Sequence, residues 1–278
     1  METALQLAQR GFRVWASMRN VETSAAPLLA EARLRGVVVE PVELDVTSPA
    51  SMDAALGEIL AKSGGLYGLV NNAGMTKIGY FEDFSDAEVR RVLEVNLVGV
   101  MNLTKRVVAA MRTARRGRII MMSSVGAKIP SLCMAPYFAS KSAIEGFSES
   151  LFLEMAPFNV QVVIVEPGMV KTDIWEKDAY LDSAFNPDGP YYQYSRRLRE
   201  ETDSLLKISS IRPADVASVV CEAMTTERPR LRYAIGWRAK LLISLRRHLP
   251  GELFERIYFG EILRRVTRST GDAGGNST

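Results

Sequence analysis

Tyr137 and Lys141 stand four residues apart in a segment with a helical pattern. Residues at this spacing lie one above the other on the same helix face. A tyrosine hydroxyl has an unperturbed pKa of about 10, so it works as an acid–base group at neutral pH only when a nearby cation stabilises its ionised form. Lys141 could supply that charge. The pair therefore suggests proton transfer at a substrate oxygen, as hydride transfer to a carbonyl requires.

Other polar residues close predicted strands, which is where open α/β sheets bind their ligands. Ser124 ends the strand that precedes Tyr137, and its hydroxyl could hold the same oxygen atom. Residues 71–74 (Asn-Asn-Ala-Gly) end the strand before that, and Pro167-Gly168 ends the strand that follows. Their common position predicts one site at the carboxyl ends of the strands.

The elements that must position these residues alternate between helix and strand, which is typical of a parallel sheet covered on both faces. We predict an α/β fold with a doubly wound, Rossmann-type parallel sheet. The predicted strands are 12–17, 37–44, 66–70, 118–122, 160–165 and 231–235. The predicted helices are 2–10, 22–35, 49–62, 85–111, 136–156 and 213–225. Residues 171–200 are predicted to be an irregular, aromatic segment.

From about residue 1 to 236, the ordered motifs resemble the short-chain dehydrogenase/reductase family. The residues that carry the resemblance are Asp45, Asn71-Asn72-Ala73-Gly74, Asn96, Ser124, Tyr137-Phe138-Ala139-Ser140-Lys141 and Pro167-Gly168-Met169-Val170-Lys171-Thr172. The Arg19-Asn20 pair and residues 229–233 look, more loosely, like the hydroxysteroid and retinol dehydrogenase branch. The resemblance implies hydride transfer between a nicotinamide cofactor and a carbonyl or alcohol carbon.

The resemblance also implies a role for each matching residue. Tyr137 would be the acid–base residue, Lys141 would lower its pKa and bind the nicotinamide ribose, and Ser124 would position the substrate. Asn96 would hold a water molecule in a proton relay. The implied cofactor contacts are Asp45 and Val46 at the adenine, Asn71, Ala73 and Gly74 on the adenosine side, and Pro167, Gly168, Val170 and Thr172 at the nicotinamide end. No metal site is expected.

Three of these residues have structural alternatives. Asn96 lies in an apolar helix and could mark a kink, and Thr172 could be a helix cap. Asp45 could be a turn residue without a ligand.

The choice of cofactor depends on the end of the strand at 12–17. NAD-selective sites place a carboxylate there for the ribose 2′-hydroxyl, whereas a 2′-phosphate favours a guanidinium group. Met18 occupies the position of the acid and Arg19 follows it. We therefore expect NADP(H), with NAD(H) as the alternative if Arg19 is only a solvated loop residue.

The family's first strand and its Gly-rich turn have no counterpart before the helix at 2–10. In the usual strand order the absent strand is the central one, and the absent turn binds the pyrophosphate. We expect about 15 to 20 residues to be missing, through a late start codon or a truncation. Strands 12–17 and 66–70 should then be neighbours separated by a gap or paired directly.

Composition bounds the remaining possibilities. A net charge of +3 is too small to indicate a nucleic-acid partner, and the two cysteines, Cys133 and Cys221, form neither a disulfide framework nor a metal-ligand spacing. No apolar run is long enough to span a membrane and no signal pattern begins the chain, so we expect a cytoplasmic protein.

The C-terminal part predicts an extension of the same domain. The expected division is a domain at 1–236, amphipathic helices within 237–266, and a disordered tail at 267–278. Arginines gather in the helical part, which leaves peripheral membrane contact open. From the family we expect a homodimer or homotetramer through the helices at 85–112 and 136–156.

Two functions remain in competition. The first is an NADP(H)-dependent oxidoreductase acting on a lipophilic substrate of steroid, retinoid or long-chain type, because six aromatic residues at 171–200 would cover the nicotinamide end of the site. The second is a non-catalytic relative that serves as a binding or scaffold protein and has lost the nucleotide-binding turn. The retention of Ser124, Tyr137 and Lys141 favours the enzyme.

Overall fold

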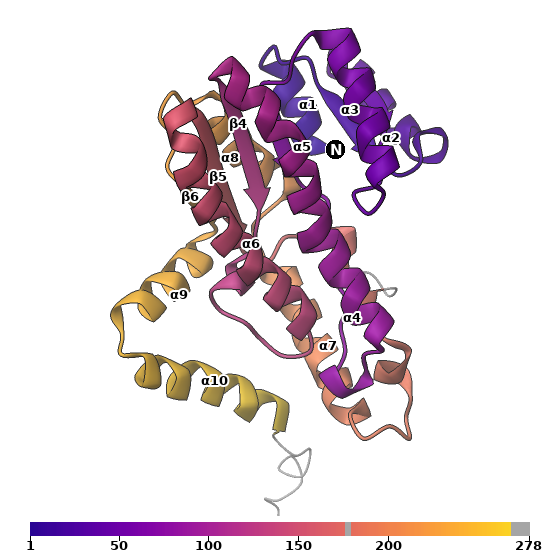
Figure 1. Ribbon diagram of the computed structural model, residues 1–278. Coiled ribbons are helices and arrows are strands. Elements are labelled where there is room, and N and C mark those ends of the chain that lie inside the picture. Colours follow the sequence, from indigo (N-terminus) through magenta and orange to yellow (C-terminus); the bar gives the residue numbers. More distant parts are fainter. Residues whose placement is uncertain (176–178, 268–278) are drawn as a thin grey trace, which may run out of the picture.

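The computed structural model describes residues 1–175 and 179–267 (Figure 1). The strands are β1 (Trp15–Met18), β2 (Glu40–Glu43), β3 (Gly68–Asn71), β4 (Gly117–Met122), β5 (Val160–Pro167) and β6 (Arg232–Ile235). All of these strands pair in parallel, in one sheet of order β1-β2 and one of order β3-β4-β5-β6. The predicted α/β class with a parallel, Rossmann-like sheet is confirmed.

The sheet is interrupted between β1 and β3, which share no hydrogen-bond ladder within the described residues. Residues 1–14 form helix α1 (Glu2–Gln9) and a turn, not a strand. The segments that lead into β1 and β3 lie close together, because the rings of Phe12 and Tyr67 stack with centroids 6.1 Å apart. The prediction of neighbouring strands separated by a gap is therefore confirmed.

Helices account for most of the remaining chain. The further α-helices are α2 (Val21–Leu34), α3 (Pro49–Ser63), α4 (Asp86–Leu93), α5 (Gly99–Ala114), α6 (Ala135–Met155), α7 (Tyr192–Ile208), α8 (Pro213–Thr225), α9 (Trp237–His248) and α10 (Gly251–Thr267). The short helical turns are η1 (Phe81–Asp83), η2 (Glu94–Val98), η3 (Val125–Ala127), η4 (Ala156–Phe158), η5 (Asp173–Trp175) and η7 (Asp182–Phe185).

Helices cover both faces of the four-stranded sheet. Figure 1 shows α5 and α6 on one side of β4 and β5, with α8 on the other. Successive side chains of a strand point to opposite faces, and β5 follows that rule. Its Val163 and Val165 join the apolar cluster that contains Val220 of α8, whereas Val160 and Val162 join the cluster on the α5–α6 side. Both faces of β5 are thus core, which explains its continuous apolar sequence.

The long helical segment predicted at 85–111 begins as expected and is interrupted once. Ser85 Oγ accepts from the Glu88 N–H at 3.2 Å and Glu88 Oε2 accepts from the Ser85 N–H at 2.9 Å, forming a capping box. The π-helical turn η2 then separates α4 from α5. Gly99 follows it at a close crossing, because a Cβ atom there would lie 2.4 Å from the Val46 carbonyl oxygen.

The segment at 171–200 is not irregular throughout, so that prediction is wrong for residues 192–200. Residues 192–208 form α7, a 17-residue helix that contains Tyr192 and Tyr194. Charged and polar side chains dominate its sequence, and Leu198 is its contribution to the neighbouring apolar cluster. Its few apolar residues, among them Tyr194, Leu198 and Leu205, keep helical spacing, so the helical period could have identified it.

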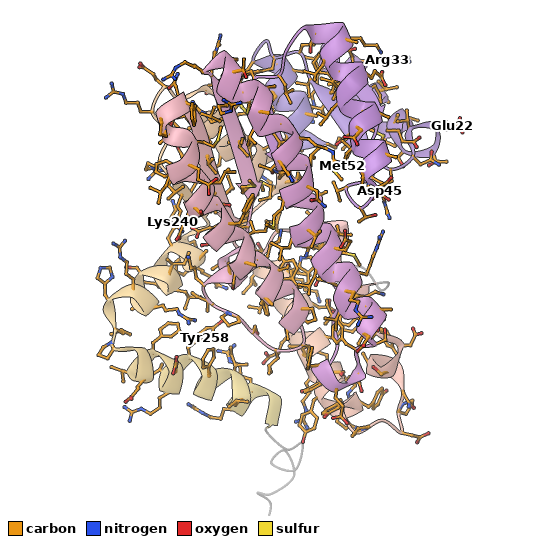
Figure 2. The ribbon with its side chains drawn as sticks, in the orientation of Figure 1. Glu22, Arg33, Asp45, Met52, Lys240 and Tyr258 are labelled. Atoms are coloured by element: carbon orange, nitrogen blue, oxygen red, sulfur yellow. The ribbon has the colours of Figure 1, made fainter. Side chains whose placement is uncertain are left out.

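The predicted C-terminal helices are present as α9 and α10. Figure 2 labels Lys240 on α9 and Tyr258 on α10, where Tyr258 stacks on Phe254 with ring centroids 5.3 Å apart. Arg246 of α9 lies over the Phe254 ring and joins the two helices. Within residues 1–175 and 179–267, none of the helices combines the length and apolarity needed to span a bilayer. The tail predicted at 267–278 lies outside the described residues from 268 onward.

Candidate functional site

Tyr137 and Ser124 come together between the end of β4 and the first turn of α6. Pro136 occupies the start of α6, where its missing N–H costs nothing, and so places Tyr137 in the first turn. The Ser124 side chain is near enough to the Tyr137 hydroxyl to lower the pKa of Tyr137. Ser124 Oγ accepts from the Gly126 N–H at 3.1 Å, which orients it at the strand end. The two hydroxyl groups that sequence analysis assigned to one substrate oxygen therefore lie near each other.

Lys141 lies one helical turn beyond Tyr137 and is buried. Its Nζ is 5.7 Å from the centroid of the Tyr137 ring and donates to the Met122 carbonyl at 2.7 Å. Burial lowers the pKa of Lys141 to about 8. Burial also raises the pKa of Tyr137, an effect that the Ser124 side chain opposes. The Lys141 ammonium group donates to the Met122 carbonyl, and the lowering of the Tyr137 pKa by Lys141 stays a prediction.

Asn96 lies in the π-helical turn η2 and is fully buried. Its side chain binds both backbone groups of Met75, accepting from the N–H and donating to the carbonyl at 2.8 Å each. It also donates to Ser140 Oγ at 3.1 Å, next to Lys141. Asn96 thus holds the loop after β3 against α6. Its position in a π-helical turn also matches the structural alternative, which was that Asn96 marks a kink in the helix.

Gly74 is part of the same junction. A Cβ atom built on Gly74 would lie 3.5 Å from Asn96 Oδ1 and 3.7 Å from Lys141 Nζ. The loop after β3 therefore borders the lysine directly. Ala73 beside it is exposed, while Asn71 is buried and donates to Thr104 Oγ1 at 2.9 Å. The Asn71 side chain is thus engaged with α5.

Asp45, Val46 and Arg19 lie at the ends of the two strands in the smaller sheet. Asp45 Oδ1 accepts from the Thr47 N–H and hydroxyl at 2.8 Å each, and these bonds are the main reason that the pKa of Asp45 is lowered. This is the turn role that was left open for Asp45, which follows β2 and is labelled in Figure 2. Arg19 is exposed and close enough to Asp45 to lower its pKa further.

The residues predicted for the nicotinamide end follow β5. Pro167 ends the strand, and the Gly168 N–H donates to the Ile235 carbonyl at 3.0 Å. Val170 accepts from Trp175 Nε1 at 3.0 Å. Thr172 directly precedes η5 and its carbonyl accepts from the Trp175 N–H at 3.3 Å, so it occupies the capping position named as its alternative.

Aromatic residues of the 171–200 segment pack in the same apolar cluster as Tyr137. The partly and fully buried members of this cluster include Trp175, Tyr180, Phe185, Ile78 and Met134. The segment therefore adjoins the Tyr137 side of the site.

Sequence analysis missed a group of buried charges behind the site. Glu145 accepts from Ser123 Oγ at 2.9 Å, and Glu166 of β5 is buried beside it. Glu145 stands four residues after Lys141, so the spacing that singled out Tyr137 and Lys141 continues for one more turn. That repeat was the sequence signal from which Glu145 could have been identified. Glu166 was visible only as the residue before Pro167.

The comparisons with known proteins concern the family and the fold. A family profile described as short chain dehydrogenase matches residues 1–180. The chain is 33% identical over 271 residues to retinol dehydrogenase 16 from Rattus norvegicus, covering 92% of this chain and 83% of that protein. A short-chain dehydrogenase from Streptomyces avermitilis has a TM-score of 0.75 at 30% identity, covering 95% of this chain and 93% of that one.

Two further similar structures contain nicotinamide cofactors. A metagenomic short-chain oxidoreductase in complex with NADP has a TM-score of 0.66 at 26% identity, covering 84% of this chain and 90% of its own. An NAD+-bound xylitol dehydrogenase has a TM-score of 0.72 at 24% identity, covering 84% and 92%, and shows the fold alone.

Proposed function

Because the chain belongs to the short-chain dehydrogenase family, we propose that it transfers hydride between NADP(H) and a carbonyl or secondary alcohol of a lipophilic substrate. Tyr137, Ser124, Lys141 and Asn96 form the proposed catalytic core. The observation that carries the proposal is the proximity of Tyr137 to Ser124, with buried Lys141 Nζ 5.7 Å from the Tyr137 ring centroid. Such a set has little value to a scaffold, so the enzyme is favoured over the non-catalytic alternative.

In this proposal the chain's residues handle the proton and the substrate oxygen. When bound, the nicotinamide ring supplies or accepts the hydride. Tyr137 donates its hydroxyl proton to the carbonyl oxygen in reduction and takes it back in oxidation. Ser124 donates a hydrogen bond to the same oxygen, and Lys141 stabilises the tyrosinate that forms. Asn96 keeps the loop after β3 against α6.

The residues at one end of the site fit a nicotinamide nucleotide. Gly74 leaves the approach to Lys141 Nζ open, since any larger residue would place a side chain within 4 Å of it. Lys141 would then bind the ribose, with Ala73 and Gly74 along the adenosine side and Pro167 to Thr172 beside the nicotinamide. Asp45 and Val46 would border the adenine. Residues 1–11 contain no Gly-rich turn for the pyrophosphate.

Selectivity for NADP(H) is proposed from Arg19. This exposed arginine directly follows β1, and Asn20 after it caps α2 by accepting from the Thr23 N–H at 2.9 Å. The cap fixes the backbone next to Arg19 at the end of β1. In sites of this kind, the residue at this strand end contacts the ribose 2′ position, which supports a role for the Arg19 guanidinium group in binding a 2′-phosphate. A 2′-phosphate would pair with it in charge-assisted hydrogen bonds.

The substitution Arg19→Ala tests this assignment. It should weaken NADPH binding by about 1.5 to 3 kcal/mol, roughly 10- to 150-fold, and leave NADH binding nearly unchanged. Dissociation constants from cofactor fluorescence would measure both. Arg33→Ala, an exposed charge change on α2, is the matched control and should alter neither. Equal losses for the two cofactors with Arg19→Ala would refute the assignment.

A lipophilic substrate is proposed from the apolar cluster around Tyr137. Trp175, Tyr180 and Phe185 line this side of the site, and flat apolar surfaces suit a steroid, retinoid or long-chain carbonyl compound. The similarity to a rat protein named as a retinol dehydrogenase supports the same class.

A panel of carbonyl compounds, followed by NADPH oxidation, tests the proposed function. We expect kcat/KM for retinoid, steroid and long-chain substrates to exceed that for sugars and small keto acids by about tenfold or more, since each buried CH2 group contributes about 0.8 kcal/mol. A preference for polar substrates would overturn the lipophilic assignment. Failure to bind either cofactor or to reduce any compound would favour the non-catalytic alternative.

Association is proposed at two surfaces. Val98, Met101 and Leu153 are exposed on the helices predicted to form a homodimer or homotetramer interface. On α9 and α10, exposed Leu241 and Ile257 stand among arginines, which suits peripheral contact with an anionic membrane.

A further inference from the structure

Two buried carboxyl groups meet behind the ends of β4 and β5. Glu145 on α6 has 3% of its surface exposed and Glu166 on β5 has 2%. Both side chains lie against the same Arg232 Nε, so the two carboxyl groups are neighbours. Two ionised carboxylates buried this close repel each other, which favours a proton on one of them. The protonated group can then donate a hydrogen bond to the other, because an ionised carboxylate only accepts.

The charges around the pair favour a proton as well. Lys128 forms an ion pair with Glu145, and Arg232 Nε lies 3.6 Å from Glu145 Oε2 and 3.7 Å from Glu166 Oε1. Arg232 is also bound by Glu149 through its Nη2. Three carboxyl groups thus face two cations. With Glu166 protonated, two negative charges balance two positive ones, and no excess charge is buried.

Of the two carboxyl groups, Glu166 is the one that its surroundings stabilise less in the ionised form. Its Oε1 accepts no hydrogen bond within the part of the chain that the structure describes, although the atom is buried. Glu145 Oε2 also accepts no hydrogen bond among the described residues, but it forms the ion pair with Lys128, and Glu145 Oε1 accepts from the Ser123 hydroxyl. Burial, followed by the charge of Glu145, raises the pKa of Glu166 to about 7. The proton therefore belongs to Glu166 and is donated to Glu145.

The pair is connected to both strand ends of the proposed site. Ser123, which donates to Glu145, is the neighbour of Ser124, and its N–H donates to the Val165 carbonyl at 2.8 Å. Glu166 is followed directly by Pro167 and Gly168. Ionisation of Glu166 would place two like charges in contact at this junction, which separates the groups or draws in water.

We propose that Glu166 holds a proton that it donates to Glu145, and that this shared proton positions the ends of β4 and β5 carrying Ser124 and the Pro167-Gly168 turn. Both glutamates are positioning residues, because neither touches the Tyr137 hydroxyl. The effect on catalysis rests on the proposed function, whereas the shared proton does not. The shared proton is lost as pH rises through neutrality.

The shared proton can be tested by unfolding in urea between pH 5 and pH 8. In the unfolded chain a glutamate has a pKa of about 4.3, so between about 4.3 and about 7 the folded protein holds a proton that the unfolded chain has released. Folding stability from this group therefore falls with rising pH. The substitution Glu166→Gln keeps an N–H donor for Glu145 at every pH.

The unfolding constant of the wild type, divided by that of Glu166→Gln, should increase by roughly tenfold per pH unit between about 5 and 7 and then level off. Glu149→Gln removes a more exposed carboxylate from the same cluster and is the matched control, which should leave the wild-type slope intact. A ratio that does not change with pH would overturn the shared proton. An infrared band of a buried protonated carboxyl group, lost in Glu166→Gln, is the second expected result.

Positioning is tested by the pH profile of kcat/KM. Relative to Glu166→Gln, the wild type should lose activity as pH rises through 7, with the loss in kcat rather than in KM. Parallel profiles would overturn the positioning role. Absence of turnover in both proteins would count against the proposed function, and the unfolding ratio would still decide whether Glu166 holds the proton.

Discussion

Replacing Tyr137 by Phe should lower kcat by a factor of 100 or more. The ring keeps its packing beside Phe138, but the hydroxyl near Ser124 is lost. A positioned acid–base group typically contributes about 100- to 10,000-fold. Cofactor affinity should stay within about threefold, because the phenyl ring preserves the shape of the site. Single-turnover reduction and cofactor titration would measure the two effects.

Tyr67→Phe provides the control for this change. Tyr67 stacks on Phe12 before β3, outside the proposed site, and loses the same atom in the substitution. We expect kcat to change by less than about tenfold, since Tyr67 has no proposed acid–base or substrate-binding role. Retention of more than about a tenth of wild-type turnover by Tyr137→Phe would remove this residue from the proposed mechanism.

Replacing Lys141 by Met should produce opposite effects on activity and stability. Turnover should fall about 100-fold or more, because the tyrosinate loses its stabilising cation. The shift of the Lys141 pKa from 10.5 to about 8 corresponds to a cost of about 3 kcal/mol for holding the charge in the folded protein. Losing the charge-assisted bond to the Met122 carbonyl costs about 2 kcal/mol in return. The free energy of unfolding should therefore rise by about 1 kcal/mol.

The sign of this stability change depends on pH. Below about 8 the folded wild type holds the charge and the variant has its full advantage. Between about 8 and 10.5 the folded lysine is neutral while the unfolded one is still charged, so wild-type stability rises and the advantage shrinks. Urea unfolding at pH 7 and pH 10 measures both values, with exposed Lys105→Met as the control. A variant that is less stable at pH 7 would contradict the assignment of a costly buried charge.

Much of the fold follows from local signals in the sequence. The apolar run at 160–165, the Ser85–Glu88 capping box and Pro213 at the start of α8 each predict an element that the structure contains. The proximity of Ser124 and Tyr137 was also predictable. In a parallel sheet the carboxyl ends of neighbouring strands meet at one edge, and the helix after β4 begins there.

The remaining features depend on contacts between distant residues. Burial raises the pKa of Tyr137, and the apolar cluster around it includes Tyr180, which lies more than 40 residues away in the sequence. Glu145 and Glu166 lie on different elements, and Arg232 reaches them from a third. No spacing rule connects three such positions.

Gly99 places an unusual limit on the protein's tolerance to mutation. In most helices an alanine is favoured over a glycine by about 1 kcal/mol, so a library aimed at greater stability would include Gly99→Ala. Here the added methyl group would meet the Val46 carbonyl oxygen, which is backbone and cannot rotate away. Helix α5 and the loop after β2 could then separate only by moving the turn that contains Asp45. Engineering of this helix must therefore leave its first residue unchanged, whatever helix propensity recommends.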